Sequence, residues 1–207
     1  MNHFIVTIGR EFGSSGKEIG RELAWHLGVE CYDRNIVEKA VEDSGLSLEV
    51  VSKAEERFAA GSSRLLSIGG LSLNNVMQMD AAVEAQSNVI KELADKSSCV
   101  IIGRCADFIL KDRKDVLNVF IYAPYEIRLK RIMDLYGFSK QQAERSVKRI
   151  DQQRHNYYKY VTGQDRGDRH GKQLMIDSSL FGIRGTADLL FDIVRKRFEL
   201  DIEKPGI

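Results

Sequence analysis

A glycine-rich stretch near the N-terminus has the residues to bind phosphate. It reads GSSGK from Gly13 to Lys17 and follows an apolar run. Backbone N–H groups in such a turn, followed by the start of a helix, form an anion site, and Lys17 would add a positive charge beside the β- and γ-phosphates. The usual phosphate-loop pattern is G-x-x-x-x-G-K-[ST], whereas Glu11 stands here at the first glycine and Glu18 and Ile19 follow the lysine. Taken alone, the stretch fits a phosphate cradle and a tight turn with a solvated lysine equally well.

Arginines at two further places could grip phosphate oxygens. Arg104 follows the apolar run CVIIG, and a guanidinium group there can bind a phosphate through two parallel hydrogen bonds. Arg128 and Arg131 are three residues apart and therefore share one face of a predicted helix. The alternatives are a surface ion pair for Arg104, for instance with Asp107, and a solvated helix face for the other two arginines.

The segment between residues 145 and 159 is dense in positive charge, and Asp151 is its one acid. Its basic residues are Arg145, Lys148, Arg149, Arg154 and Lys159. Phosphoryl transfer depends on positioning and on positive charge around the moving oxygens. A helical hairpin that carries these residues could close over a site and exclude water. The alternatives are a basic surface hairpin and an oligomer contact.

Asp33 is a further candidate, at the end of the run VECYD. Its carboxylate could orient a substrate or a magnesium-bound water, or it could cap the following helix. The four histidines show no metal-ligand spacing, so the sequence assigns no metal ligand. The triplet RGD at 166–168 is interpreted as a coincidence of three residues.

Short apolar runs supply the strands that would position these side chains. They are Phe4–Ile8, Val29–Asp33, Cys99–Gly103, Leu117–Ala123 and Leu174–Ser179. Such runs, alternating with helical patterns, predict about five strands in a mainly parallel sheet with helices on both faces. Ligands of such sheets bind beyond the carboxyl ends of the strands. The glycine-rich stretch, Asp33, Arg104 and the segment after Ala123 all follow predicted strands, so they are expected at one shared edge.

Helical patterns fill the gaps between these runs. Residues 16–27 have apolar side chains at helical spacing and stop at Gly28. No strand is indicated between 34 and 96, where residues 35–45 and 80–97 read as amphipathic helices joined by a polar, glycine-dotted connection at 58–75. The last helix carries an apolar stripe made of Ala187, Leu190, Phe191, Val194 and Phe198.

Composition narrows the class of protein. The chain has 207 residues, of which 43% are hydrophobic, which favours a single domain with a real core. The 31 basic and 30 acidic residues nearly cancel, so no strong overall field draws the chain to nucleic acid or to a membrane. No signal peptide or spanning segment is indicated. The three cysteines, Cys31, Cys99 and Cys105, are interpreted as reduced core thiols of a cytoplasmic protein.

In combination, these segments resemble the cytidylate kinase-like family, a branch of the P-loop nucleoside monophosphate kinases. The segments that carry the resemblance are VTIGREFGSSGKEIG, CVIIGRCADFIL, VFIYAPYEIRLKRI, DQQRHNYYKYVTG and LMIDSSLFGI, in this order. The similarity runs nearly from end to end. It implies a P-loop kinase core spanning residues 1–207, with a helical acceptor-binding lobe at 34–96 and an arginine-rich lid at 125–170.

The resemblance also implies roles for individual residues. ATP phosphates would be held by Gly13, Ser14, Ser15, Gly16, Lys17 and Glu18. The acceptor would be bound by Asp33, Arg104, Asp151 and Arg154, of which Arg104 would grip its phosphate and Asp151 could reach its sugar. Lys17, Arg128, Arg131 and Arg154 would stabilise charge during transfer, with Arg128 and Arg131 as lid arginines.

The implied reaction is transfer of the γ-phosphoryl group of ATP to a nucleoside monophosphate, CMP or dCMP, with Mg²⁺. The sequence departs from true cytidylate kinases at Glu11, at Ile19 and at Cys105, where those enzymes have an aspartate. Kinases of another small acceptor and a nucleotide-binding regulatory protein with little turnover therefore stay open as alternatives. A homodimer through the helical lobe is a further open expectation.

Overall fold

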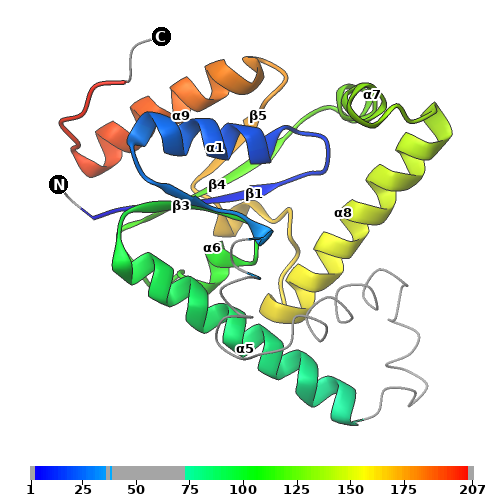
Figure 1. Cartoon of the computed structure of the whole chain (residues 1–207), viewed down its shortest axis with the longest axis horizontal. Coiled ribbons are helices and arrows are strands. Elements are labelled where there is room, and N and C mark those ends of the chain that lie inside the picture. Colours follow the sequence, from blue (N-terminus) through cyan, green and yellow to red (C-terminus); the bar gives the residue numbers. More distant parts are fainter. Residues whose placement is uncertain (1–2, 36–37, 39–72, 205–207) are drawn as a thin grey trace.

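A five-stranded parallel sheet forms the centre of the molecule. The computed structural model describes residues 3–35, 38 and 73–204, with only the backbone at 73–76 and 78. The strands are β1 (Ile5–Arg10), β2 (Glu30–Tyr32), β3 (Cys99–Ile102), β4 (Val116–Tyr122) and β5 (Leu174–Asp177). Their order is β2-β3-β1-β4-β5 and every neighbouring pair is parallel (Figure 1). The predicted parallel sheet is therefore confirmed, with strand ends that shift by one or two residues.

Two helices cover one face of this sheet, α1 (Gly16–Leu27) and α9 (Gly182–Phe198) (Figure 1). The apolar stripe predicted for the last helix is buried against the strands, together with Ile19 and Leu23 of α1. Burial of apolar side chains against a sheet is the main favourable term in folding such a layer. The helix predicted over residues 16–27 is present with those bounds.

The opposite face is covered by α5 (Leu73–Lys96) and the short helix α6 (Ala106–Ile109). Their core contains Ile90 and Ala94 of α5, which pack with Ile5 and Ile101 from the strands. The connection predicted at 58–75 is wrong at its end, because α5 begins at Leu73. Asparagine has a weak helix propensity, which this long helix overrides at 74–75. The rest of that connection and most of the helix predicted at 35–45 lie outside the described residues.

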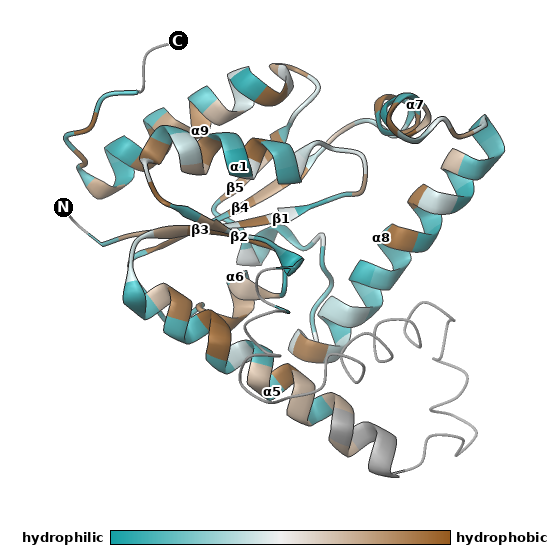
Figure 2. Ribbon diagram, viewed as in Figure 1, coloured by the Kyte–Doolittle hydropathy of each residue, from teal (hydrophilic) through white to brown (hydrophobic). Residues whose placement is uncertain are grey.

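A helical hairpin extends to the side of the sheet and is made of α7 (Tyr125–Tyr136) and α8 (Lys140–Thr162) (Figure 1). Ser139 caps the N-terminus of α8, and its hydroxyl accepts from Gln142 N–H in a capping box. A small apolar cluster joins the two helices, and Phe12 packs against it. Figure 2 shows α8 as mostly hydrophilic and the central strands as hydrophobic. The hairpin is thus held by few apolar contacts, and Phe12 links it to the loop after β1.

The three cysteines lie in or near the core, and no membrane-spanning helix is found among the described residues. Cys99 and Cys105 are buried, Cys31 is half-buried, and all three are free thiols. No helix in the described part of the chain is long and apolar enough to cross a bilayer.

Candidate functional site

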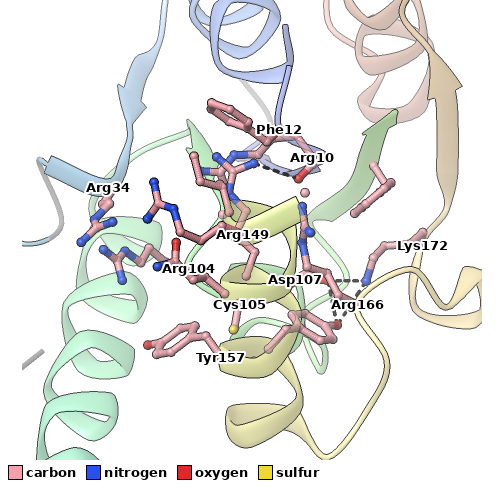
Figure 3. Close-up of a pocket in the computed structure, with 17 residues that line it drawn as sticks. Arg10, Phe12, Arg34, Arg104, Cys105, Asp107, Arg149, Tyr157, Arg166 and Lys172 are labelled. Atoms are coloured by element: carbon pink, nitrogen blue, oxygen red, sulfur yellow. Dashed lines mark hydrogen bonds and ion pairs between the residues drawn. The ribbon is translucent and has the colours of Figure 1, made fainter. Parts of the chain in front are cut away.

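A pocket of about 450 Å³ opens at the carboxyl ends of β1 and β3, next to the loop that follows β1. Its lining is strongly cationic, and Asp107 is the one acid that contributes to it. Figure 3 shows side chains from the loop after β1, from the turn after β3 and from α8 converging on it. The basic residues in the lining are Arg10, Arg34, Arg104, Arg149, Arg154, Arg166 and Lys172.

Arg104 reaches this pocket from a tight turn. Gly103, Arg104 and Cys105 all have positive φ angles, of 79°, 57° and 55°, a conformation that is costly for residues with a Cβ. The Arg104 carbonyl accepts from Gln86 Nε2 at 3.3 Å, and its guanidinium pairs with Glu38 and lies 6.0 Å from the centre of the Tyr157 ring. The ion pair with Asp107 that the sequence left open is absent from the contacts of these described residues, because Asp107 binds Lys172 instead.

Arg154 and Arg149 enter the pocket from α8. The Arg154 guanidinium lies 5.6 Å from the centre of the Phe12 ring, and its Nη1 donates to the Arg10 carbonyl at 3.4 Å. Arg149 sits at the exposed rim. Helix α8 therefore places Arg154 against Phe12 and Arg10 and brings Arg149 to the rim of the pocket; closure of the hairpin over the site stays a prediction.

A buried polar triad forms the other end of the pocket. Lys172 Nζ lies 2.5 Å from Asp107 Oδ2 and donates to Tyr158 Oη at 3.1 Å, while the Tyr158 hydroxyl donates to Asp107 at 3.0 Å. Burial and the Asp107 carboxylate raise the pKa of Tyr158, so its hydroxyl keeps its proton. Cys105 lies beside this triad in the lining, and burial raises the pKa of its thiol. This end offers fixed hydrogen-bond partners to an uncharged part of a ligand.

The glycine-rich loop follows Phe12, which lines the pocket, although residues 13–18 are not part of the lining. Gly13 has φ +85°, and a Cβ there would lie 3.0 Å from the backbone oxygen of Arg128, so the position requires glycine. Ser178 Oγ donates to the Ser14 carbonyl at 2.7 Å and the Ser14 hydroxyl donates to the carbonyls of Glu11 and Ile121. Within the described residues, the N–H groups of residues 13–18 donate to no protein acceptor. Hydrogen bonds from Ser178 and within the loop hold its backbone in place, while N–H groups at the start of α1 stay available. Such an arrangement is suited to binding a phosphate group.

Arg128 and Asp151 form a buried support under this loop. Arg128 Nη1 donates to the Phe12 carbonyl at 3.1 Å and lies 2.6 Å from Asp151 Oδ2. Asp151 Oδ1 accepts from Phe12 N–H at 2.9 Å, and Glu11 Oε2 lies 3.2 Å from Arg128 Nε. Glu11, which stands at the first glycine of the usual pattern, thereby anchors the loop to α7. Neither Arg128 nor Asp151 contributes to the cationic pocket lining.

The remaining predicted cations are paired with carboxylates. Lys17 Nζ and Arg21 Nη2 both lie 2.8 Å from Asp33 Oδ2, and Arg131 Nη2 lies 3.1 Å from Glu18 Oε1. The Asp33 side chain is buried, with 4% of its surface exposed, whereas that of Lys17 is 44% exposed. Lys17, Asp33, Glu18 and Arg131 thus gather at the start of α1, on the helix side of the glycine-rich loop.

The acidic side chains near the start of α1 are the candidates for holding a metal ion. The described residues contain no group of three acidic, histidine or cysteine side chains that could hold a metal. Asp33 and Glu18 are the carboxylates at the start of α1, and both are engaged by cations. Magnesium would therefore depend mainly on phosphate oxygens and water, which is its common mode in kinases.

Sequence reasoning missed several cations that the structure brings into the site, among them Arg10 and Arg166. Arg10 is the last residue of β1 and Arg166 belongs to the RGD triplet, and both line the pocket with Arg104 and Arg154. Arg10 could have been found, because a cation at a strand end next to a glycine-rich loop lies at the expected edge. The place of Arg166 depends on how the loop before β5 folds back over the strands, for which the sequence carries no signal.

Comparisons of the sequence with known proteins agree on one class of protein, the cytidylate kinases and their relatives. The model of the cytidylate kinase-like family matches residues 5–180. A cytidylate kinase of Methanopyrus kandleri is 23% identical over 209 residues, which cover 97% of this chain and 95% of that protein. A cytidylate kinase of Pyrococcus abyssi is 24% identical over 201 residues, with 97% and 96% covered.

Similar solved structures show the same fold. An uncharacterized protein from Eubacterium ventriosum superposes with a TM-score of 0.67 at 23% identity and covers 95% of this chain and 98% of its own. A shikimate kinase from Bacteroides thetaiotaomicron has a TM-score of 0.52 at 14% identity, with 95% and 99% covered. The parallel sheet, the glycine-rich loop and the match over residues 5–180 lead to one conclusion: the chain belongs to the cytidylate kinase-like family and has the fold of the P-loop kinases.

Proposed function

We propose that this protein transfers the γ-phosphoryl group of ATP to a nucleoside monophosphate, with CMP or dCMP as the acceptor. One observation carries the proposal. A pocket lined by seven cations and one acid reaches Phe12, just before a glycine-rich loop whose N–H groups have no acceptor among the described residues, in a chain of the cytidylate kinase-like family. Donor phosphates and an acceptor phosphate would then meet at the carboxyl edge of the sheet.

The donor side uses the loop and the start of α1. Residues 13–18 hold the ATP phosphates through N–H groups and the helix dipole, and Lys17 adds its charge. Bound Mg²⁺ would neutralise charge between the phosphates, with Asp33 or Glu18 as the carboxylate that holds its water. Because Lys17 is paired with Asp33 at 2.8 Å, its side chain has to exchange one anionic partner for another when ATP binds.

The acceptor side uses the pocket. Arg104 and Arg154 bind the acceptor phosphate through charge-assisted hydrogen bonds, and the Asp107–Tyr158–Lys172 triad faces the base. Asp33 and Asp151 keep their proposed roles at the acceptor, although the contacts of Asp151 with Phe12 and Arg128 make a positioning role the better supported one. Arg131 and Arg128 belong to the hairpin that would close over the transferred group.

The chemistry requires no covalent intermediate. An acceptor phosphate oxygen attacks the γ-phosphorus in line, the bond to the β-phosphate oxygen breaks, and ADP leaves. Catalysis of this kind rests on positioning and on positive charge around the transferred group. Lys17, Arg131 and Arg154 are the residues we assign to that charge.

Phosphorus NMR of the protein with ATP, Mg²⁺ and a panel of nucleoside monophosphates tests the proposal. We expect CDP and ADP to form from CMP, and we expect this turnover to fall by at least about 100-fold in Lys17→Ala, as for loss of a charge that stabilises the transition state. ATP binding without transfer to any member of the panel would reject the proposal and leave open a kinase of another acceptor and a regulatory nucleotide-binding protein.

A different small acceptor is the second candidate. Cys105, which lies in the pocket lining and has its pKa raised by burial, supplies no charge where true cytidylate kinases have an aspartate. The replacement of this aspartate by Cys105 makes cytosine recognition less well supported, while the arginines proposed to bind phosphate are unaffected. Turnover of another phosphorylated compound in the same assay would select this candidate.

A further inference from the structure

A buried amide of α5 contacts two residues of the pocket wall. Gln86 is only 2% exposed, and it lies outside the pocket lining. Its Nε2 donates to the Arg104 carbonyl at 3.3 Å and to Tyr157 Oη at 2.8 Å. A polar side chain is costly to bury unless its hydrogen bonds are made. These two contacts therefore explain why an amide is tolerated at this place in the core.

The first contact acts on a strained turn. Arg104 and Cys105 follow each other with φ angles of 57° and 55°, which is the left-handed region that residues with a Cβ rarely adopt. Such a conformation persists only where surrounding groups hold it. Gln86 binds the carbonyl of Arg104, the residue at the centre of this turn, whereas Glu38 pairs with its guanidinium. The backbone and the charged end of Arg104 are thus held by different residues.

The second contact reaches the helical hairpin. Tyr157 belongs to α8, and its ring centre lies 6.0 Å from the Arg104 guanidinium carbon (Figure 3). A further hydrogen bond from the Tyr160 hydroxyl to Asp80 joins α8 to α5. The Gln86 amide therefore lies where α5, α8 and the turn after β3 meet.

The hydrogen bonds of Gln86, rather than its bulk, distinguish it from its neighbours in α5. Ala85, Val89 and Ile90 of the same helix belong to the apolar core under the sheet. A side-chain amide has two N–H donors, and Gln86 Nε2 donates once to the turn and once to α8. A methionine in its place would fill a similar volume and donate to neither group.

We propose that Gln86 is a positioning residue that holds the turn of Arg104 and ties this turn to α8. Its effect on the acceptor rests on the proposed function, because it acts through Arg104 and touches no ligand itself. Its hold on the turn does not depend on which ligand the pocket takes. The two parts can therefore be tested separately.

Alkylation of Cys105 tests the hold on the turn without any ligand. Cys105 is 5% exposed and follows Arg104, so a looser turn exposes its thiol. In Gln86→Met, the rate of reaction with iodoacetamide, followed by peptide mass spectrometry, should rise about tenfold, as for loss of one buried hydrogen bond. Cys99, which is buried in β3, should keep its wild-type rate, because only general unfolding would expose both thiols.

A matched variant on the same helix provides the control. Asn88 carries an exposed amide two residues after Gln86, so Asn88→Met should leave the labelling of Cys105 unchanged. Tyr157→Phe removes the hydroxyl that accepts from Gln86 but keeps the ring beside Arg104. It should raise the labelling of Cys105 about threefold, because the bond to the Arg104 carbonyl remains.

Steady-state kinetics and calorimetric titration test the effect on the acceptor. Gln86→Met should raise the KM and the Kd for CMP about tenfold and leave kcat and the Kd for ATP nearly unchanged, as for a contact equally strong in the ground state and the transition state. A residue that merely supports the fold would lower kcat through a smaller active fraction and leave KM unchanged.

A double-mutant cycle shows whether Gln86 acts through Arg104. In the Arg104→Met background, Gln86→Met should cause no further loss of CMP affinity, because the guanidinium that it positions is already absent. Additive losses would overturn the proposal. Unchanged labelling of Cys105 in Gln86→Met would overturn it as well, as would unchanged affinity for CMP.

Two further outcomes remain decisive. If Gln86→Met does not fold, as judged by thermal melting, Tyr157→Phe decides, and wild-type labelling of Cys105 in that variant would overturn the proposal. If the wild type neither binds nor phosphorylates CMP, the proposed function fails. The labelling of Cys105 then still decides whether Gln86 holds the turn.

Discussion

The cations at the start of α1 and the cations in the pocket are held in different ways. Lys17 and Arg131 each contact a carboxylate on or near α1, within 3.1 Å. Arg10 and Arg166, by contrast, keep buried nitrogens without partners among the described residues. Both groups lie at the same edge of the sheet, but the second has fewer anionic partners: Arg166 has Asp151 Oδ1 at 3.5 Å, and Arg10 has no ion pair with a described residue.

This difference indicates how each site meets its ligand. Paired cations cost little in the ligand-free protein, and they contribute to binding only after they leave their carboxylates. Unpaired cations cost stability when the pocket is empty and recover it when an anion binds. We infer that the pocket is preorganised for its anion, whereas the donor side rearranges.

The largest loss of stability is expected from breaking the ion pair between Arg128 of α7 and Asp151 of α8, which holds the loop after β1. Asp151→Asn removes the closer of the two carboxylate charges that face the buried Arg128 guanidinium, at 2.6 Å against 3.2 Å for Glu11. Breaking one partner of a buried pair costs about 3 kcal/mol, the lower end of the usual range. Urea denaturation followed by circular dichroism should show this loss of unfolding free energy.

The exposed pair Lys159–Asp165, also held by α8, provides the control. Its side chains are 58% and 65% exposed, so Asp165→Asn should leave stability unchanged, as is common for surface ion pairs. Equal stability of Asp151→Asn and Asp165→Asn would show that Asp151 does not support the loop.

A smaller effect is expected at the start of α1. Asp33→Asn keeps an oxygen that can accept from Asn35 N–H but removes the charge that holds Lys17. Lys17 then reaches ATP without giving up an anionic partner, so ATP should bind about threefold more tightly in the absence of magnesium, the scale of an ion pair whose cation is exposed to solvent. Calorimetric titration with ATP measures this change, and weaker binding would contradict the idea that Asp33 competes for Lys17.

The parallel sheet and the glycine-rich loop could be predicted from the sequence because both depend on short local patterns of residues. The runs IVTI, CVII and VFIY are apolar and β-branched or aromatic, and short runs of this kind between helices form parallel strands. The glycine-rich loop and Arg104 were then placed by one rule, that strand ends share an edge. The predicted bounds of most strands and helices differ from the observed ones by a few residues at most, for the same reason.

The hydrogen-bond and ion-pair partners of the site residues could not be predicted, because they depend on which helices and strands become neighbours in the fold. The pairing of Lys17 with Asp33 joins α1 to the end of β2, and the contact of Asp151 with Phe12 spans 139 residues of sequence. The sequence shows both carboxylates but not the distances that turn them from ligand-binding groups into partners of cations. Arg166 was dismissed for this reason, since its three-residue motif carries no information about the pocket beside it.

Salt dependence of acceptor binding tests the central claim most directly. The measurement is the affinity of the wild-type protein for CMP and for cytidine at low and at high ionic strength. We predict that CMP binds at least about 100-fold more tightly than cytidine at low salt, because several charge-assisted contacts are gained, and that salt weakens CMP binding alone. Equal affinities for the two compounds, with no effect of salt, would contradict an acceptor pocket built for phosphate.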